Sequence, residues 1–351
     1  MKNFWEKIKQ NTLVYGRVIP AILMLVVFVS FISIGRLSFT YIFDNTAVFW
    51  VTRIITFLMF LAIASWGFLE LTRAFLDKHP VYSVLILILL VCLFVNKNFS
   101  TLVFDNNVDN SKFITGFTNV KVFVTDYTVY LGAFISTVLF VLLRTFSAQN
   151  LSKKYLFYKA IYFFIASLIL LIFYRGFIYL LIVDKIGIQY LILFLLIATG
   201  HDIGGFFGGK YLGHKFIKSK LAPTISPKKT WEGALVGVGV AIVIAISFAA
   251  TWNVIDPYPW NFFNLLTEDI VFIDLINNSQ STSVSYKVIT AFFLIFAPIF
   301  ALLGDLFFSL IKRVCDIKDF SNIFRDHGGL LDRFDSIATV ATLWFLFSYG
   351  L

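Results

Sequence analysis

The chain of 351 residues is 59% hydrophobic and only 14% charged, and it has a formal net charge of +9. Soluble domains carry about a quarter charged residues, so this composition excludes an ordinary soluble globular protein. The apolar residues form long runs and do not follow the periods of amphipathic helices or strands.

Nine apolar runs are candidates for crossing a bilayer as helices. A hydrocarbon core about 30 Å thick requires roughly 20 apolar residues per helix. Runs this long and uniform are unsuited to the strands of a membrane barrel, the other structure that can satisfy its backbone in lipid. We therefore predict an all-α, polytopic membrane bundle with about nine transmembrane helices. The runs are 18–34, 47–73, 81–95, 127–143, 155–181, 187–207, 233–252, 288–308 and 335–351.

Lys and Arg residues are concentrated in alternate loops. The rich segments are the N-terminal arm, 73–78, 144–159, 210–229 and 312–333, and the poor loops are 36–46, 96–126, 182–186 and 253–286. The positive-inside rule places the rich segments in the cytoplasm, together with the N-terminus. The basic excess is therefore a topology signal, and we expect no nucleic-acid partner.

The charged residues of the first half of the chain are scattered. We expect residues 1–181 to be a scaffold of transmembrane helices that faces lipid, and residues 182–351 to form the catalytic transmembrane domain. Glu70 and Arg73 fit a local ion pair near the end of a span. Arg175 lies inside an apolar run, where an ionisable side chain marks a functional site or reaches for the membrane interface. The two cysteines lack any metal or redox spacing, so we expect free thiols.

The first of two polar segments, residues 200–233, combines a glycine-rich stretch with a Ser-Pro-Lys-Lys-Thr run. Two cations and two hydroxyls in a fixed turn before a helix N-terminus form a plausible polyphosphate cradle. The alternative is an ordinary basic cytoplasmic loop. Asp202 lies at the inner end of a span, where a carboxylate needs a partner, water or a metal. The candidate cradle residues are Ser226, Lys228, Lys229 and Thr230.

The second polar segment, residues 304–335, has the stronger chemical pattern. On a helix, Asp305, Ser309, Lys312 and Arg313 share one face because they are spaced i, i+4, i+7 and i+8. Carboxylates without Cys or several His residues favour Mg²⁺ or Mn²⁺, and neighbouring cations favour a phosphate ligand. The segment thus indicates metal-assisted phosphoryl or nucleotidyl transfer. The alternative is a salt-bridge network that closes two helix ends.

The end of this segment adds two more acids. Asp332 and Asp335 are spaced i, i+3 and would share a face of the last helix, directly after a turn at Gly328 and Gly329. His327 precedes that turn and is either a structural hydrogen-bond donor or a residue that faces a ligand.

The two segments together resemble the phosphatidate cytidylyltransferases, also called CDP-diacylglycerol synthases. The resemblance covers roughly residues 200–335. The long signature is Ser309-x-Ile311-Lys312-Arg313-x4-Lys318-Asp319-x-Ser321-x2-Phe324-x2-His327-Gly328-Gly329-Leu330-x-Asp332-Arg333-Phe334-Asp335, and the second hallmark is Ser226-Pro227-Lys228-Lys229-Thr230-Trp231-Glu232-Gly233.

The resemblance implies an enzyme that converts CTP and phosphatidate to CDP-diacylglycerol and pyrophosphate, with one or two Mg²⁺ ions. It also implies a multispan fold in the cell membrane, an active site at the cytoplasmic face and a homodimer. We expect Asp305 and Asp332, with Asp335, to hold the metal. The expected catalytic residues are Asp305, Lys312, Arg313, Asp332 and Arg333, and the expected substrate-binding residues are Asp202, Ser226, Lys228, Lys229, Thr230, Ser309 and His327.

Three other functions stay open at this point. A lipid kinase for polyprenol or phytol, or a cytidylyltransferase for another lipid phosphate, would also use CTP. A transporter usually places its charges near the bilayer midplane in repeated halves, whereas these charges cluster at one face. The Asp-Gly-x2-Ala-Arg hallmark of the CDP-alcohol phosphatidyltransferases does not occur in the chain.

Overall fold

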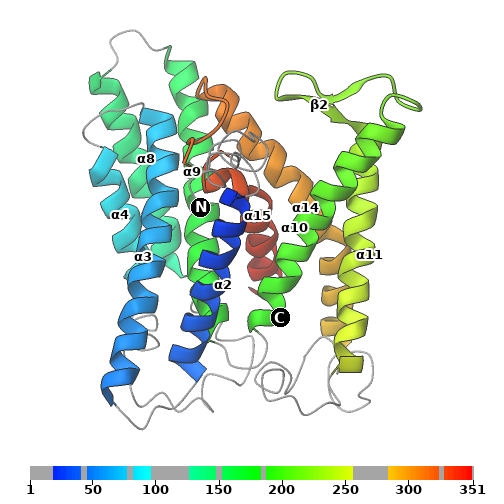
Figure 1. Cartoon of the computed structure of the whole chain (residues 1–351). Helices are drawn as coiled ribbons and strands as arrows, with labels where there is room; N and C mark the ends of the chain where they lie inside the picture. The colour runs from blue at the N-terminus through cyan, green and yellow to red at the C-terminus, as the bar shows by residue number, and fades with distance from the viewer. Residues whose placement is uncertain are drawn as a thin grey trace, which may run out of the picture. The chain divides into compact units, whose positions relative to one another are not determined.

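The computed structural model describes residues 19–40, 46–76, 82–95, 126–147, 152–182, 187–255, 284–323 and 328–349 (Figure 1). Within these ranges the chain forms nine α-helices and one short β-hairpin. Each predicted apolar run coincides with one of the helices, which confirms a helical, multi-pass membrane protein. The helices are α2 (Ile19–Thr40), α3 (Thr46–Leu76), α4 (Tyr82–Phe94), α8 (Tyr127–Ser147), α9 (Lys153–Ile182), α10 (Gly187–Leu212), α11 (Trp231–Ile255), α14 (Val284–Val314) and α15 (Leu331–Tyr349).

Six of the described helices are long and apolar enough to cross a membrane, namely α3, α8, α9, α10, α11 and α14. In contrast, α4 has 13 residues, which gives it a length of about 20 Å at 1.5 Å per residue. That length is below the thickness of a hydrocarbon core, about 30 Å. Nine crossings and a cytoplasmic N-terminus therefore stay predictions.

The chain divides into two compact units that do not follow chain order. Unit 1 comprises Met1–Val91, Phe134–Ser167 and Lys312–Phe334, and unit 2 comprises Cys92–Ala133, Leu168–Ile311 and Asp335–Leu351. Several helices continue from one unit into the other, including α14 and α15. The predicted functional division at residue 181 is of a different kind and stays a prediction.

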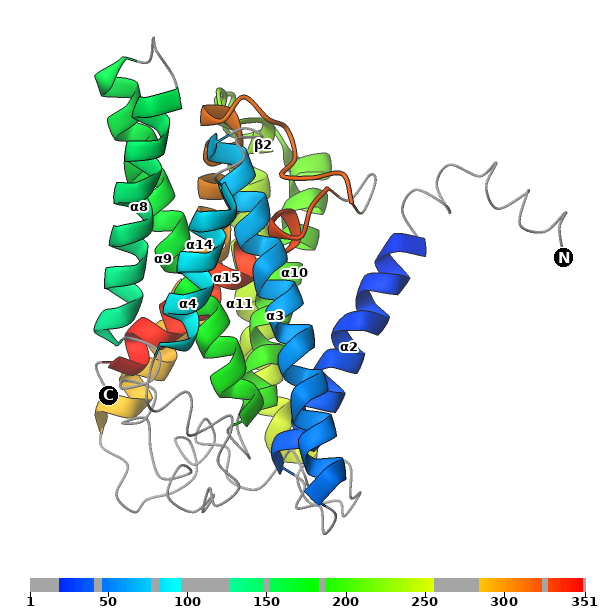
Figure 2. The ribbon, with the colours of Figure 1, turned by 90° about the vertical axis from the view of Figure 1, so that its left-hand side faces the viewer.

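Within unit 2, α10 and α11 lie side by side because glycines face each other across their contact (Figures 1 and 2). A Cβ atom added at Gly204 would lie 2.9 Å from Cβ of Val240, and one added at Gly237 would lie 2.7 Å from the carbonyl oxygen of His201. Small residues allow such a close backbone approach, which drives helix association in lipid. The glycine-rich stretch of the first polar segment is therefore a packing surface of α10.

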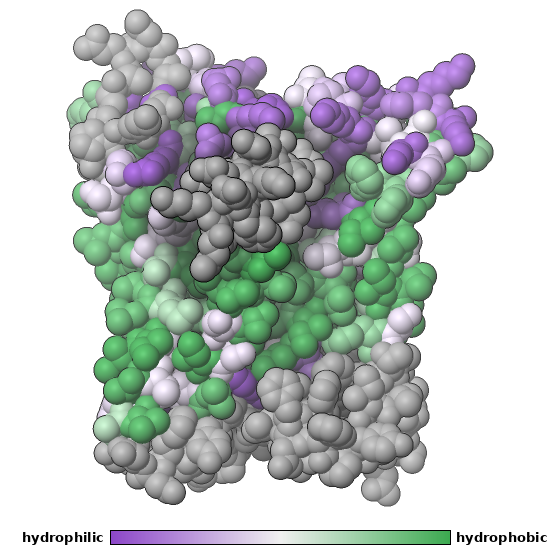
Figure 3. Space-filling model, viewed as in Figure 1, coloured by the Kyte–Doolittle hydropathy of each residue, from purple (hydrophilic) through white to green (hydrophobic). Residues whose placement is uncertain are grey.

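The Ser-Pro-Lys-Lys-Thr run forms a strand. It is β2 (Ser226–Thr230), and it pairs antiparallel with β1 (Lys220–Ala222). The predicted fixed turn was therefore wrong, whereas the predicted helix does follow the run directly, because α11 begins at Trp231. A proline is tolerated in β2 because both strands of a two-stranded sheet are edges. Figure 3 shows hydrophilic residues at this hairpin and hydrophobic residues along α10 and α11.

Arg175 of α9 is completely buried in unit 2. Its guanidinium donates hydrogen bonds to the carbonyl oxygens of Cys92 and Leu93, at the end of α4, and to Oγ1 of Thr128. The last carbonyls of a helix lack partners within it, and Arg175 supplies those partners. The structure therefore gives Arg175 partners inside the protein, and its depth in the membrane stays a prediction.

Unit 1 contains a cluster of aromatic side chains from three helices. Phe75 of α3 packs edge-on against Phe140 of α8 and Phe163 of α9, at ring-centroid distances of 5.7 and 5.3 Å, and the latter two stack at 4.9 Å. Tilted and offset pairs of this kind add stabilisation beyond their buried area. The cluster fixes the end of α3 that carries Glu70.

The contact between α10 and α11 yields a matched pair of variants. Gly237→Ala introduces a methyl group against the backbone of α10 and should lower the free energy of unfolding by about 1–3 kcal/mol. Gly239→Ala, two residues further along α11, meets nothing within 4 Å and should raise it by up to about 1 kcal/mol through helix propensity. Unfolding in detergent by SDS titration measures both. Equal effects of the two variants would contradict a close contact at Gly237.

Candidate active site

Unit 2 holds an ion pair between the two polar segments of the sequence. Nζ of Lys229, on β2, contacts a carboxylate oxygen of Asp305, on α14. The hydroxyl of Ser309, one turn further along α14, donates to the other oxygen of Asp305 at 3.4 Å. The side chains of Lys229 and Asp305 are about a quarter exposed, at 24% and 23%. Both charges are therefore accessible to a solute.

The hairpin that carries Lys229 is anchored to the start of α11. Oε1 of the buried Glu232 accepts hydrogen bonds from the backbone N–H groups of Phe216 (3.0 Å) and Ile217 (2.7 Å). Oγ1 of Thr230 accepts one from the N–H of Gly233 at 3.1 Å, which makes Thr230 the N-cap of the helix. Lys229 therefore lies in the chain between two anchored points, residues 216–217 and Thr230.

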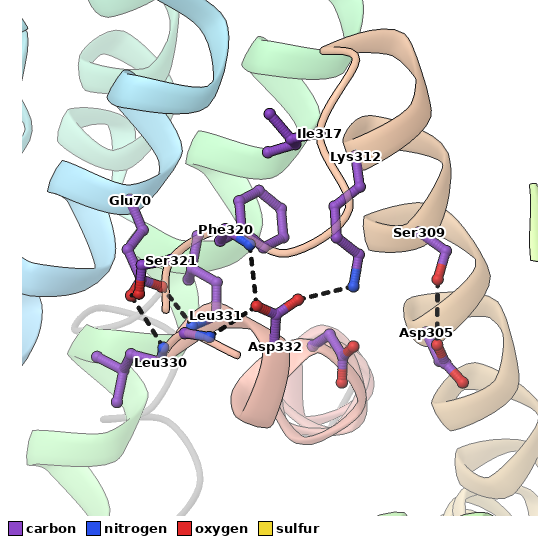
Figure 4. Close-up of polar contacts among 12 residues, drawn as sticks. Glu70, Asp305, Ser309, Lys312, Ile317, Phe320, Ser321, Leu330, Leu331 and Asp332 are labelled. Atoms are coloured by element: carbon purple, nitrogen blue, oxygen red, sulfur yellow. Dashed lines mark hydrogen bonds and ion pairs between the residues drawn. The ribbon is translucent and has the colours of Figure 1, made fainter. Parts of the chain in front are cut away.

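Unit 1 holds a second lysine–carboxylate pair, drawn in Figure 4. Lys312, near the end of α14, donates to Oδ1 of Asp332 at 2.7 Å. Oδ2 of Asp332 accepts from the backbone N–H groups of Phe320 (3.0 Å) and Gly329 (2.8 Å). The side chains of Lys312 and Asp332 are 13% and 6% exposed. This carboxylate therefore shapes the backbone that surrounds it.

The predicted glycine turn before the last helix is confirmed at Gly328. This residue has a φ of 75°, a left-handed conformation that L side chains rarely adopt. A Cβ atom added there would also approach the carboxylate of Asp332, at 2.7 Å from Oδ2. The left-handed backbone and the nearby carboxylate both explain why a glycine occupies position 328, shortly before the start of α15.

Glu70 of α3 is the polar residue that the sequence analysis placed wrongly. Its carboxylate does not pair with Arg73, which donates instead to the hydroxyl of Tyr82 at 3.4 Å. It accepts hydrogen bonds from the hydroxyl of Ser321 and from the backbone N–H groups of Leu330 and Leu331 (Figure 4). The only signal in the sequence was an acidic residue within an apolar run. Ser321, Leu330 and Leu331 lie some 250 residues from Glu70, so no local pattern could indicate them.

The other predicted residues lie on the same elements as these two pairs, on α10, or outside the described residues. Asp202 is exposed on α10, with its carboxylate 3.4 Å from Nδ1 of His201. Lys228, Arg313 and Arg333 are exposed on β2, α14 and α15, and Arg313 donates to the carbonyl oxygen of Ile317. His327 lies outside the described residues. Ser226 begins β2, and Asp335 accepts from the backbone N–H of Ser336 at 2.7 Å.

Asp305 and Asp332 are the residues that fit a divalent cation. Each binds a lysine ammonium through one carboxylate oxygen, and a lysine at a carboxylate occupies the position that a metal cation would take. Nowhere in the described ranges do three or more His, Cys, Asp or Glu residues gather into a metal-binding group. Mg²⁺ commonly binds through one or two carboxylates and completes its shell with water and substrate phosphates. The donor chemistry therefore suits Mg²⁺ that is shared with a phosphate ligand.

Comparison with known proteins gives a consistent result. A family model described as "Cytidylyltransferase family" matches residues 15–350. A phosphatidate cytidylyltransferase of Bacillus subtilis is 35% identical over 164 residues, which cover 46% of this chain and 49% of that protein. One of Rickettsia bellii is 36% identical, covering 44% and 55%. A Mycoplasma pneumoniae relative is 37% identical, covering 44% and 42%. The chain thus spans about half the length of these relatives.

Thr230 offers a test of how the hairpin is held. Thr230→Val keeps the shape of this buried side chain but leaves the N–H of Gly233 without its cap, so the free energy of unfolding should fall by about 1 kcal/mol. Thr230→Ser retains the hydroxyl and should recover most of that loss. SDS titration in detergent compares the two variants. A valine variant as stable as the serine variant would show that the cap contributes nothing.

Proposed function

The chain belongs to the cytidylyltransferase family, and from this premise we propose that it is a phosphatidate cytidylyltransferase. The proposed reaction transfers CMP from CTP to phosphatidate and yields CDP-diacylglycerol and pyrophosphate. The names of the Bacillus subtilis and Rickettsia bellii relatives state this activity for those proteins. A multi-pass helical fold suits it, because the acyl chains of the lipid remain in the bilayer while the phosphate reacts at the surface.

The observation that carries the proposal is the pair of lysine–carboxylate contacts. One joins Lys229 to Asp305 in unit 2, and the other joins Lys312 to Asp332 in unit 1. Asp305 and Lys312 lie on α14, seven residues apart, which is about 10 Å along the helix. One helix thus carries both an acid and a base of the signature, and each is paired with a residue of opposite charge.

The chemistry requires positioning and charge neutralisation more than proton transfer. A phosphatidate oxygen attacks the α-phosphorus of CTP, the new P–O bond forms, and the bond to the bridging oxygen breaks as pyrophosphate leaves. The attacking phosphate is already ionised near neutral pH, so the step needs no general base. Preorganised cations that stabilise charge on the transferred group supply most of the catalysis in such reactions.

We assign roles to the residues by their charge and by the family resemblance. Lys229 and the exposed Lys228 bind the triphosphate and the leaving group, with Ser226 and Thr230 beside them on β2. Lys312, Arg313 and Arg333 bind the phosphate of the lipid. Asp202, Ser309 and His327 complete the substrate contacts. When bound, Mg²⁺ neutralises phosphate charge, and Asp305 and Asp332 would hold it, with Asp335.

Location and assembly are part of the same proposal. The distribution of the basic loops supports an active face in the cytoplasm, and the bacterial relatives favour the plasma membrane. A homodimer is proposed on the family resemblance alone. No nucleic acid takes part.

Labelled CTP tests the reaction directly. Purified protein in phosphatidate-containing vesicles, with Mg²⁺, should transfer label from the α-phosphate of CTP into lipid and release labelled pyrophosphate from γ-labelled CTP. A lipid kinase would instead transfer the γ-label to a lipid alcohol. Incorporation of α-label into another lipid phosphate, but not into phosphatidate, would overturn the substrate. Absence of any incorporation would overturn the function.

Neutralising either candidate metal ligand should abolish turnover. Asp305→Asn and Asp332→Asn should each lower the Mg²⁺-dependent rate by about 100-fold or more, while the protein still inserts and extracts normally. Asp316→Asn is the matched control: Asp316 is exposed in the same segment and has a φ of 55°, which asparagine also tolerates. Wild-type rates in both Asp305→Asn and Asp332→Asn would refute the metal assignment.

A further inference from the structure

Glu70 is an acid at a depth where an unpaired charge is costly. Only 1% of its surface is exposed, and burying a carboxylate is tolerated when hydrogen bonds satisfy its oxygens. Four donors do so. Oε1 accepts from Nε1 of Trp66 (2.7 Å), from the hydroxyl of Ser321 (2.6 Å) and from the N–H of Leu330 (3.0 Å), and Oε2 accepts from the N–H of Leu331 (2.8 Å).

Two of the four donors belong to the start of α15. The carbonyl oxygen of Leu330 accepts the first bonds of the helix, from Arg333 and Phe334, so Leu330 is its N-cap residue. The first N–H groups of a helix lack internal partners and carry partial positive charge, which an anion stabilises. Glu70 supplies that anion from a different helix.

The contact of Glu70 with the N–H of Leu331 lies one peptide unit from Asp332, the candidate catalytic residue. Asp332 directly follows Leu331, and it binds both Lys312 and the backbone N–H of Phe320. Ser321, the other partner of Glu70 in this segment, directly follows Phe320. Glu70 thus contacts the residue that follows Phe320 and the two residues that precede Asp332 (Figure 4). A Cβ atom at Gly329 would lie 2.5 Å from Oε1 of Glu70, so the segment packs closely on this carboxylate.

We infer that Glu70 is a positioning residue for catalysis: it acts through Ser321, Leu330 and Leu331 to set the orientation of Asp332 and Lys312. This inference rests on the proposed function. Misplacement of a reacting group by about 1 Å costs on the order of 100-fold in rate. Loss of the carboxylate therefore impairs turnover, although Glu70 touches neither substrate.

Glu70→Gln is the decisive variant. Glutamine has the same shape but only one acceptor oxygen, so it cannot accept from Leu330 and Leu331 on separate oxygens. We expect kcat to fall about 10- to 100-fold, while the KM for CTP changes less than about threefold, because the proposed triphosphate ligands lie on β2. Amide hydrogen exchange at Leu330 and Leu331 should accelerate about tenfold.

Two further variants separate positioning from folding. Thr72→Val is the control: Thr72 is fully buried on the same helix, and within the described residues its hydroxyl donates only to carbonyl oxygens of α3. It should leave kcat and exchange in the segment unchanged. Ser321→Ala removes one donor and keeps the carboxylate, so it should cost a few-fold in kcat. Its effect in the Glu70→Gln background should be smaller than in the wild type, because the two residues act together.

The outcomes are distinct. Faster exchange with unchanged kcat would make Glu70 a helix cap only and overturn the inference. Unchanged exchange at Leu330 and Leu331 would overturn it as well, as would an equal loss of kcat in Thr72→Val. If the wild-type protein transfers no CMP to phosphatidate, the proposed function fails, whereas the exchange experiment still decides whether Glu70 holds this segment.

Discussion

An ionised side chain among apolar helices must have a partner, because removing it from water costs several kcal/mol that only pairing or hydrogen bonding offsets. This constraint governs every buried charge described above. Arg175 satisfies the open end of α4, and Glu70 satisfies the open start of α15. Lys312 neutralises Asp332. Lys229 and Asp305 also neutralise each other, and both side chains remain about a quarter exposed.

Much of the fold and part of the site could be predicted from the sequence. Uniform apolar runs have one stable form in lipid, the helix, so the position of every described helix followed from composition. Helical spacing placed Asp305, Ser309 and Lys312 on α14, and the paired glycines placed a turn before α15. The family signature then indicated the chemistry. Each of these features is local in sequence, so pattern alone was sufficient.

The remaining features depend on tertiary contacts that no local pattern records. Glu70 lies far in sequence from Ser321 and Leu331, and the spacing of acids and bases within one helix pointed to Arg73 instead. Arg175 has acceptors that are backbone carbonyls, which every residue possesses. The strand at Ser226–Thr230 forms because β1 is available to pair with it. The residues of the predicted polyphosphate cradle thus lie on a strand, a secondary structure that the sequence analysis did not anticipate.

The shortness of α4 has a consequence for how the chain assembles. Its final carbonyl groups find their donor on α9, which the ribosome makes some 80 residues later. Before α9 is inserted, these carbonyl groups can bond only to water or lipid headgroups. On its own, α4 is therefore not stable across the bilayer. Stable insertion of α4 therefore depends on α9, although α9 is synthesised later.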